Sequence, residues 1–139
     1  MSVVISGLYI SLTAILVVAF AMRVIKLRRK HKIGLGSSGN EELRIANRVH
    51  ANLVENAPIA MILLLVAELN SLSAIYMHLL GITWLVGRCL HAVGLTKGRG
   101  GYHLGRFWGG LLSWSVILIL AVFNLTHFTL DSMGYLANS

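Results

Sequence analysis

Residues 3–25 read VVISGLYISLTAILVVAFAMRVI, an apolar run in which Arg23 is the one charged side chain. A helix needs about 20 apolar residues to cross the hydrocarbon core of a bilayer, so this run is long enough to span it. The basic cluster that begins at Lys26 follows the run, whereas a secretory signal peptide carries its positive charge before a shorter apolar stretch. Residues 3–25 are therefore predicted to form a retained transmembrane helix.

The composition of the whole chain also indicates a membrane protein. Of the 139 residues, 56% are hydrophobic and 12% are charged, whereas soluble domains carry about 25% charged residues. The mean hydropathy of +0.75 excludes a disordered chain as well as a water-soluble globule. Cys89 is the single cysteine, which excludes a disulfide scaffold. We expect one integral membrane domain over residues 1–139.

Four apolar segments predict an all-α, four-transmembrane-helix bundle, with spans at about residues 3–25, 44–70, 72–95 and 104–128. Lys and Arg gather around residues 26–44 and 97–106, whereas both termini and the turn at 70–73 carry none. By the positive-inside rule, both termini are predicted to lie outside the cytoplasm. The net charge of +7 is thus a sign of topology and of contact with membrane lipids, and no nucleic-acid partner is expected.

The second span is unusual because its first half carries polar side chains at helical spacing: Arg44, Arg48, Asn52 and Glu55. These residues form one stripe of a helix, which must face protein rather than lipid. Arg88 and His91 share a face of the third span in the same way. Arg28 ends the first span and Arg106 begins the fourth. The predicted orientation therefore brings polar groups from all four helices into one layer near the cytoplasmic side.

This layer holds four or more arginines against the single acid Glu55, and a surplus of buried positive charge indicates an anionic ligand. Two structural alternatives remain open. Arg28 and Arg44 can be interfacial arginines whose guanidinium groups reach the lipid headgroups. Glu55 can instead form an ion pair with Arg48 or Arg88 that holds two helices together.

Other polar and aromatic side chains receive structural interpretations. His78, His103 and His127 are scattered without metal-ligand spacing, so no metal site is expected and interfacial roles are favoured for them. Trp84 and Trp114 are expected at the membrane interface or in helix packing. The simplest interpretation of Glu68, at the outer end of the second span, is a hydrated side chain.

Residues 48–58 read RVHANLVENAP and resemble the signature of the MAPEG family, the membrane-associated proteins in eicosanoid and glutathione metabolism. The matching positions are Arg48, Asn52, Glu55 and Pro58. The stretch GRCLH at residues 87–91 is similar to the third-helix motif of the same family. The resemblance extends over essentially the whole chain and is strongest for bacterial-type members. It implies a homotrimer of four-helix protomers, in a bacterial inner membrane, with glutathione bound between subunits near the cytoplasmic side.

The resemblance also implies roles for single residues. The positions that match glutathione-contacting residues of the family are Arg28, Arg48, Asn52, Glu55, Arg88 and His91. Arg106 occupies the start of the fourth helix, where catalytic members carry the arginine that activates the thiol. Leu95 replaces a tyrosine that some members carry one turn beyond the third-helix histidine, and the chain departs from the prostaglandin synthase branch at Phe107 and Gly110. These departures argue against prostaglandin synthase activity.

Together these features predict a glutathione-dependent transferase or peroxidase that takes apolar, electrophilic small molecules from the bilayer. Arginines suit the carboxylates of glutathione, Glu55 suits its ammonium group and Asn52 suits a peptide amide. The alternative is a non-catalytic membrane protein that binds glutathione, lipid or a partner through the same pocket. A small multidrug transporter is a third class, but residues 3–25 lack the acidic side chain that proton coupling needs.

Overall fold

Four long helices make up the chain, as the computed structural model shows for the backbone of residues 3–137 and the side chains of residues 3–133. They are α1 (Val4–His31), α2 (Glu41–Leu69), α3 (Ala74–Lys97) and α4 (Leu104–Ala137). Each is long and apolar enough to cross a membrane. The all-α, four-helix architecture is thus confirmed. The predicted spans differ from these helices mainly at their ends, since α2 begins before residue 44 and α3 begins after residue 72.

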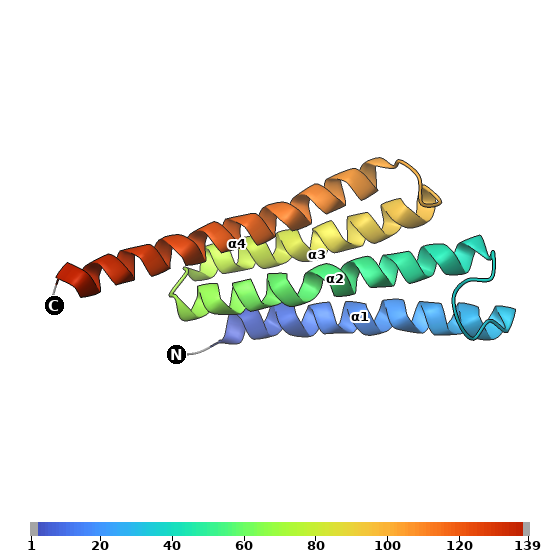
Figure 1. Cartoon of the computed structure of the whole chain (residues 1–139), viewed down its shortest axis with the longest axis horizontal. Helices are drawn as coiled ribbons and strands as arrows, with labels where there is room; N and C mark the ends of the chain where they lie inside the picture. The colour runs from blue at the N-terminus through green and yellow to red at the C-terminus, as the bar shows by residue number, and fades with distance from the viewer. Residues whose placement is uncertain (1–2, 138–139) are drawn as a thin grey trace.

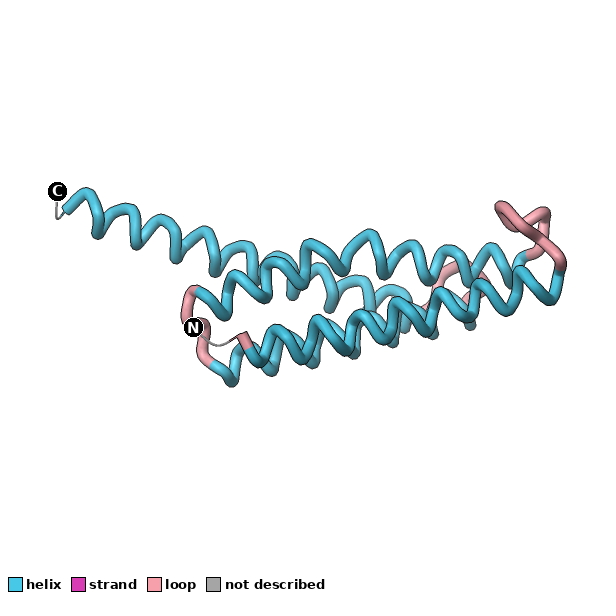
Figure 2. Tube along the Cα trace, turned by 90° about the horizontal axis from the view of Figure 1, so that it is seen from below, coloured by secondary structure: helices cyan, strands magenta, loops and turns pink. Residues whose placement is uncertain are grey.

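The helices run alternately up and down, and their loops lie at the two ends of an elongated bundle (Figures 1 and 2). Helices α2 and α3 contact each other and both of the remaining helices. Helix α4 is the longest, and its C-terminal part projects beyond the other three (Figure 1). We call the end with residues 26–44 and 97–106 the basic end. The opposite end, with the start of α1 and the turn at residues 70–73, is the turn end.

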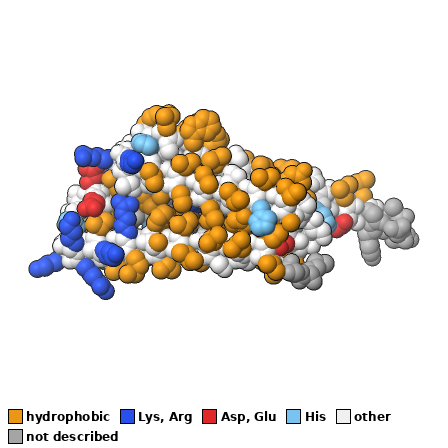
Figure 3. All heavy atoms as spheres, turned by 180° about the vertical axis from the view of Figure 1, so that it is seen from behind, with side chains coloured by type: hydrophobic (Ala, Val, Ile, Leu, Met, Phe, Trp, Pro, Cys, Tyr) orange, Lys and Arg blue, Asp and Glu red, His pale blue; other side chains and the backbone are white. Residues whose placement is uncertain are grey.

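Charged and apolar side chains are segregated along the bundle. Figure 3 shows Lys and Arg gathered at one end, with a largely apolar surface along the middle of the molecule. Large apolar side chains such as Ile15, Leu79 and Leu118 are more than half exposed on this surface. A lipid-facing surface has this character, because lipid tails are as apolar as these side chains.

The core from the middle of the bundle to the turn end satisfies its polar groups internally. Trp84 is fully buried, and its Nε1–H donates to Thr13 Oγ1 at 3.1 Å. The Thr13 hydroxyl in turn lies 3.5 Å from the Met61 sulfur. The Tyr9 hydroxyl lies 2.9 Å from His78 Nδ1, which ties α1 to α3. Tyr and Trp polar atoms need such partners when they are buried, so these bonds are what the apolar surroundings require.

Glu68 completes the start of α1, although the sequence suggested only a hydrated side chain. Its Oε1 accepts from the Ile5 N–H at 2.9 Å, and its Oε2 accepts from the Ser6 N–H at 2.7 Å. Val3, the residue before α1, makes no capping bond of its own. The first N–H groups of a helix have no partner within the helix and attract negative charge. A carboxylate from α2 therefore caps α1, and the interpretation of Glu68 as merely hydrated was wrong.

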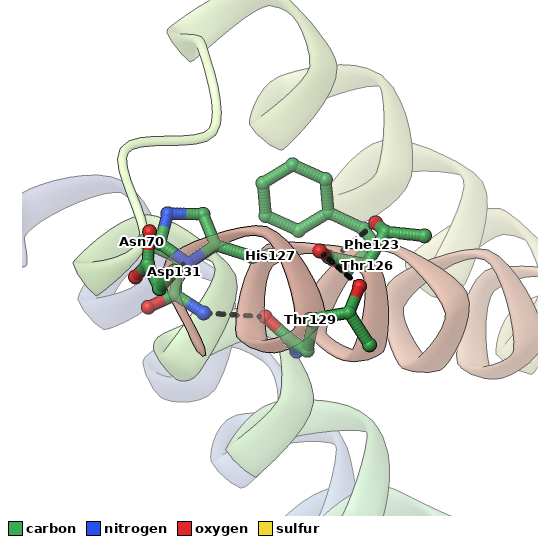
Figure 4. Close-up of polar contacts among 7 residues, drawn as sticks. Asn70, Phe123, Thr126, His127, Thr129 and Asp131 are labelled. Atoms are coloured by element: carbon green, nitrogen blue, oxygen red, sulfur yellow. Dashed lines mark hydrogen bonds and ion pairs between the residues drawn. The ribbon is translucent and has the colours of Figure 1, made fainter. Parts of the chain in front are cut away.

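Asparagines join α2 to α4 at the same end. Asn70 Nδ2 donates to Asn124 Oδ1 at 3.1 Å, and Asn124 Nδ2 donates to the Leu63 carbonyl at 3.1 Å. Beyond this contact α4 pairs its polar side chains along its own length (Figure 4), as in the ion pair of 3.2 Å between His127 and Asp131. The bonds of Asn124 to Asn70 and Leu63 fix α4 against α2 at the point where α4 leaves the bundle.

Glycines bring α3 and α4 together near the basic end. A Cβ added to Gly94 would collide with the backbone nitrogen of Arg106, and one added to Gly109 would collide with that of His91. Small residues allow helix backbones to approach this closely within a membrane. The crossing places His91 and Arg106, which are far apart in the sequence, at the same level of the bundle.

Candidate functional site

A cavity of about 410 Å³ opens between α2, α3 and α4 at the basic end. Its polar lining includes Arg48 and Asn52 from α2, His91 from α3, and His103 and Arg106 from the start of α4. Its apolar lining is one face of α4, formed by Phe107, Leu111 and Trp114. Ligand pockets have this size and this mixture of apolar walls with a few polar groups. Four of the predicted site residues are thus brought together: Arg48, Asn52, His91 and Arg106.

Arg48 and Glu55 form an ion pair, with Nη1 and Oε1 2.9 Å apart. Both side chains are more than half exposed in the isolated chain, at 58% and 52%. Arg48 borders the cavity, whereas Glu55 meets it through Arg48. An Arg48–Glu55 ion pair is therefore present, but both residues lie on α2, so it joins turns of one helix and does not hold two helices together. Because both groups lie exposed on the surface of the single chain, a ligand with its own carboxylate and ammonium can reach them and exchange partners with them.

Arg88 is buried inside the helix bundle, with 3% of its surface exposed. Its guanidinium carbon lies 5.4 Å from the centroid of the Trp84 ring, in a cation–π contact. Within residues 3–133, its Nε has no hydrogen-bond partner and no carboxylate lies within ion-pair distance. Arg88 does not border the cavity but lies one turn before His91 on α3. It supplies uncompensated positive charge behind the polar wall.

Arg106 contacts the loop before its own helix. Its Nη1 donates to the carbonyls of Gly100 and Gly101, at 2.6 and 3.1 Å. The remaining N–H groups of the guanidinium have no such bond in the described part of the chain, and the side chain borders the cavity. Arg106 therefore both fastens the α3–α4 loop and presents positive charge to the cavity.

Arg28 lies apart from this cavity. Its guanidinium donates to the Gly34 carbonyl at 3.0 Å and to Asn47 Oδ1 at 3.4 Å. It thereby holds the α1–α2 loop against α2, and within one protomer it is not brought together with Arg48 and Arg106. Arg44 lies beside Gly100 of the α3–α4 loop, also outside the cavity.

Six residues of the cavity lining were not predicted as site residues: Tyr102, His103, Phe107, Gly110, Leu111 and Trp114. His103 precedes α4, and its Nδ1 accepts from the Gly105 N–H at 3.0 Å. The neutral ring must then carry its proton on Nε2, as a donor. Trp114 follows Phe107 and Leu111 on one face of α4. That helical spacing was available in the sequence, but an aromatic on a lipid-facing helix is ordinarily an interface residue.

The donors around the cavity suit an organic anion. Guanidinium groups, a histidine and an amide recognise carboxylates and peptide groups. No cluster of three His, Cys, Asp or Glu side chains suited to a metal ion occurs in the described residues. The apolar α4 face leaves room beside the anion for a second, lipid-soluble molecule.

Comparison with known proteins agrees with this architecture. Residues 6–126 match the model of the MAPEG family. Inner membrane protein YecN of Escherichia coli strain K12 is 34% identical over 126 residues, which cover 88% of this chain and 92% of the relative. The YecN protein of Escherichia coli O6:H1 strain CFT073 is similar to the same extent. The chain is therefore a member of the MAPEG family and an integral inner-membrane protein.

Proposed function

We propose that the cavity between α2, α3 and α4 binds glutathione and that the protein is a glutathione-dependent transferase or peroxidase. One observation carries the proposal: Arg48, Asn52, His91 and Arg106 border the same cavity as an apolar wall of α4. Glutathione carries two carboxylates and one ammonium group, so its net charge is opposite to that of the cavity. The apolar wall suits an electrophile that arrives from the bilayer.

The proposed chemistry starts with the thiol of glutathione, which must lose its proton before it attacks. A guanidinium beside the sulfur favours the thiolate, and each pKa unit of lowering needs about 1.4 kcal/mol. Arg106 is assigned this role. In conjugation the thiolate forms a bond to the electrophilic carbon and displaces its leaving group. In peroxide reduction two glutathione molecules give one disulfide while the peroxide becomes an alcohol and water.

We further propose that the working unit is a homotrimer, with glutathione bound between subunits. Arg28 and Arg88 carry positive charge outside the cavity of one protomer, and a neighbouring subunit would bring further groups to the ligand. A single protomer also leaves many charges unscreened at the basic end (Figure 3). Light scattering of the detergent-solubilised protein tests this: three chains of 15.2 kDa are expected in each particle.

A non-catalytic role for the same cavity is the second candidate. It is favoured by the bonds from Arg106 Nη1 to the carbonyls of Gly100 and Gly101. An arginine that fastens a loop has less freedom to approach sulfur. In this case the protein would bind glutathione, or another organic anion, without activating its thiol.

The deciding experiment measures glutathione binding and thiolate absorption together on the detergent-purified full chain. Equilibrium dialysis gives the Kd, and ultraviolet difference absorption reports the bound thiolate. Three proteins are compared: the parent chain, Arg106→Ala and Arg29→Ala. Arg29 is an exposed arginine of α1 that does not border the cavity, so it controls for the loss of one positive charge.

The catalytic proposal expects binding with a thiolate signal in the parent and in Arg29→Ala. In Arg106→Ala the thiolate signal should fall at least tenfold, while the Kd rises by a smaller factor. Binding without any thiolate in the parent chain would favour the non-catalytic candidate. No binding by any of the three proteins would overturn the glutathione site itself.

A further inference from the structure

A second cavity, of about 430 Å³, lies at the basic end between α1, α2 and α3. Its lining is Arg23 from α1, Glu41, Glu42 and Ile45 from α2, Thr96 from α3 and Arg99 from the α3–α4 turn. It shares no lining residue with the candidate glutathione cavity. Its volume falls within the range of small-molecule sites, and the proposed function makes no use of it.

Arg23 is the charged residue that interrupts the apolar run of α1. Its Nη1 donates to Thr96 Oγ1 at 3.0 Å, which fixes the side chain against α3. In the described part of the chain no carboxylate lies within ion-pair distance of it. A charged side chain within a membrane helix is costly and needs a partner. One hydrogen bond to a hydroxyl leaves most of the guanidinium donors of Arg23 free for an anion.

The part of the cavity that α2 contributes is acidic. Glu41 and Glu42 form the first turn of α2. Glu42 Oε2 lies 3.9 Å from both Lys30 Nζ and His31 Nε2, which is the outer limit of an ion pair. Glu41 has no basic partner within that distance among the side chains described. The cavity therefore offers an unpaired cation on one side and an unpaired anion on the other, so its complement is a zwitterion.

The two charges also lie at different depths. Arg23 comes eight residues before His31, the last residue of α1, and this separation is about 12 Å along a helix that rises 1.5 Å per residue. Glu42 lies near the level of that last turn of α1, as its contacts with Lys30 and His31 show, and Glu41 precedes it at the start of α2. The guanidinium is thus deeper in the membrane than the carboxylates. A phospholipid has the same order, with its phosphate deeper than its terminal amine.

We propose that this cavity binds the headgroup of a phospholipid that carries a primary amine. The phosphodiester lies against Arg23, with Arg99 as a second cation, and the ammonium group lies against Glu41 and Glu42. Arginine recognises phosphate oxygens through paired N–H donors. The carboxylates accept from the three N–H groups of a primary ammonium. The bound lipid would hold α1 against α3 at the point where Thr96 meets Arg23.

The lining predicts which headgroups are rejected. Choline has no N–H to donate, and proteins that bind quaternary ammonium groups surround them with aromatic rings. None of the lining residues is aromatic. Glycerol headgroups carry the phosphate charge but no cation, so Glu41 would repel their lipid. An ethanolamine headgroup is therefore preferred over both choline and glycerol headgroups.

The test is a lipid titration of the detergent-purified full chain, followed by native mass spectrometry. The probes are phosphatidylethanolamine, phosphatidylcholine and phosphatidylglycerol with identical acyl chains. The expected preference for the ethanolamine lipid is at least about tenfold in Kd, which corresponds to about 1.4 kcal/mol. Arg23→Gln and Glu41→Gln should each abolish the preference. Arg29→Gln is the matched control that keeps it, because Arg29 is exposed, does not border the cavity and pairs with neither of its carboxylates in the described part of the chain.

Circular dichroism and size-exclusion elution of the same samples report whether each variant is folded, and glutathione binding reports whether the two cavities are separate. If Arg23→Gln does not fold, the exposed residue Glu41 decides the matter through Glu41→Gln. Equal affinity for the three lipids, or a preference that survives both substitutions, would overturn the proposal. So would soluble phosphoethanolamine that binds as tightly as the lipid, or glutathione that displaces the lipid in an Arg23-dependent manner. Failure of glutathione binding alone leaves the lipid preference intact, so the two proposals fail separately.

Discussion

The two ends of the bundle treat their polar side chains in opposite ways. From the turn end to the middle of the bundle, polar groups are paired: Glu68 caps α1, Tyr9 is bonded to His78, and Trp84 is bonded to Thr13. At the basic end, two cavities are bordered by charged side chains, and the buried Nε of Arg88 has no partner within the described residues. Paired polar groups at one end stabilise the fold, whereas unpaired ones at the other are available to ligands.

The physical reason for this difference is the cost of an unsatisfied polar group away from water. Within a membrane each such group costs several kcal/mol, so a chain that needs only stability satisfies all of them. The turn end meets that requirement with short bonds between helices. The basic end leaves guanidinium groups without carboxylates, which is favourable only when an anion or a partner completes them. The following predictions test whether stability and ligand binding separate along the bundle in this way.

The largest loss of stability is expected when the buried Trp84 is truncated, and the exposed Trp114 provides the comparison. Trp84→Ala removes a fully buried side chain and its bond to Thr13. The apparent free energy of unfolding should fall by about 3 kcal/mol, the lower end for such a truncation, because lipid rather than water is the competing solvent. Trp114→Ala is the matched control, since Trp114 is 61% exposed and borders the glutathione cavity.

Unfolding in mixed micelles of increasing dodecyl sulfate content measures both variants. Trp114→Ala should change stability by less than about 1 kcal/mol but should weaken the binding of apolar electrophiles. Equal losses of stability in the two variants would contradict the division between the ends.

Helical spacing in the sequence was sufficient for much of the fold and for part of the site. Hydrophobic length determined the four helices, and a three-to-four-residue period placed Arg48 and Asn52 on one face of α2. Both are local properties of a helix, so no knowledge of its neighbours was needed. The glycines of α3 and α4 then brought His91 and Arg106 to the same level, as the predicted polar layer required.

What the sequence did not predict depends on loop conformation and on contacts between helices. The Arg28 side chain turns back to the Gly34 carbonyl. Its direction depends on the conformation of the α1–α2 loop and not on helical spacing. His103 borders the cavity because the α3–α4 loop presents it there. Glu68 was interpreted as hydrated because its partners are backbone N–H groups of α1. Nearly every residue carries such a group, so no residue type in the sequence indicates the contact.

The next largest effect is expected at Glu68. Glu68→Ala leaves the N–H groups of Ile5 and Ser6 without their acceptor and should cost about 2 kcal/mol of stability. Glu68→Gln keeps one acceptor oxygen, so it should lose about half as much. Hydrogen exchange at the start of α1 provides the measurement. Unchanged protection there in Glu68→Ala would show that the cap is dispensable.

At Arg88 we expect a smaller effect, and we expect it on glutathione binding rather than on stability. Arg88→Met replaces a buried, unpaired cation by an apolar side chain of similar length, and such replacements are often neutral or stabilising. Glutathione binding should nevertheless weaken by about tenfold, or 1.4 kcal/mol, because positive charge behind the cavity is lost. Unfolding in mixed micelles tests the expected stability, and equilibrium dialysis on the same preparation tests the expected Kd. A loss of stability with unchanged Kd would make Arg88 a structural residue.

The smallest stability effect is expected for the exposed ion pair of Arg48 and Glu55. Since both side chains are more than half exposed, removing either partner should cost less than about 1 kcal/mol of stability. Their effects on glutathione binding should be larger than that and should differ, because Arg48 borders the cavity and Glu55 reaches it through Arg48. A double-mutant cycle with Arg48→Gln and Glu55→Gln separates the two quantities. If the pair only joined two turns of α2, the cycle would show coupling in stability and none in the Kd. Coupling that appears only in the Kd would show that even the paired charges of the basic end serve the ligand.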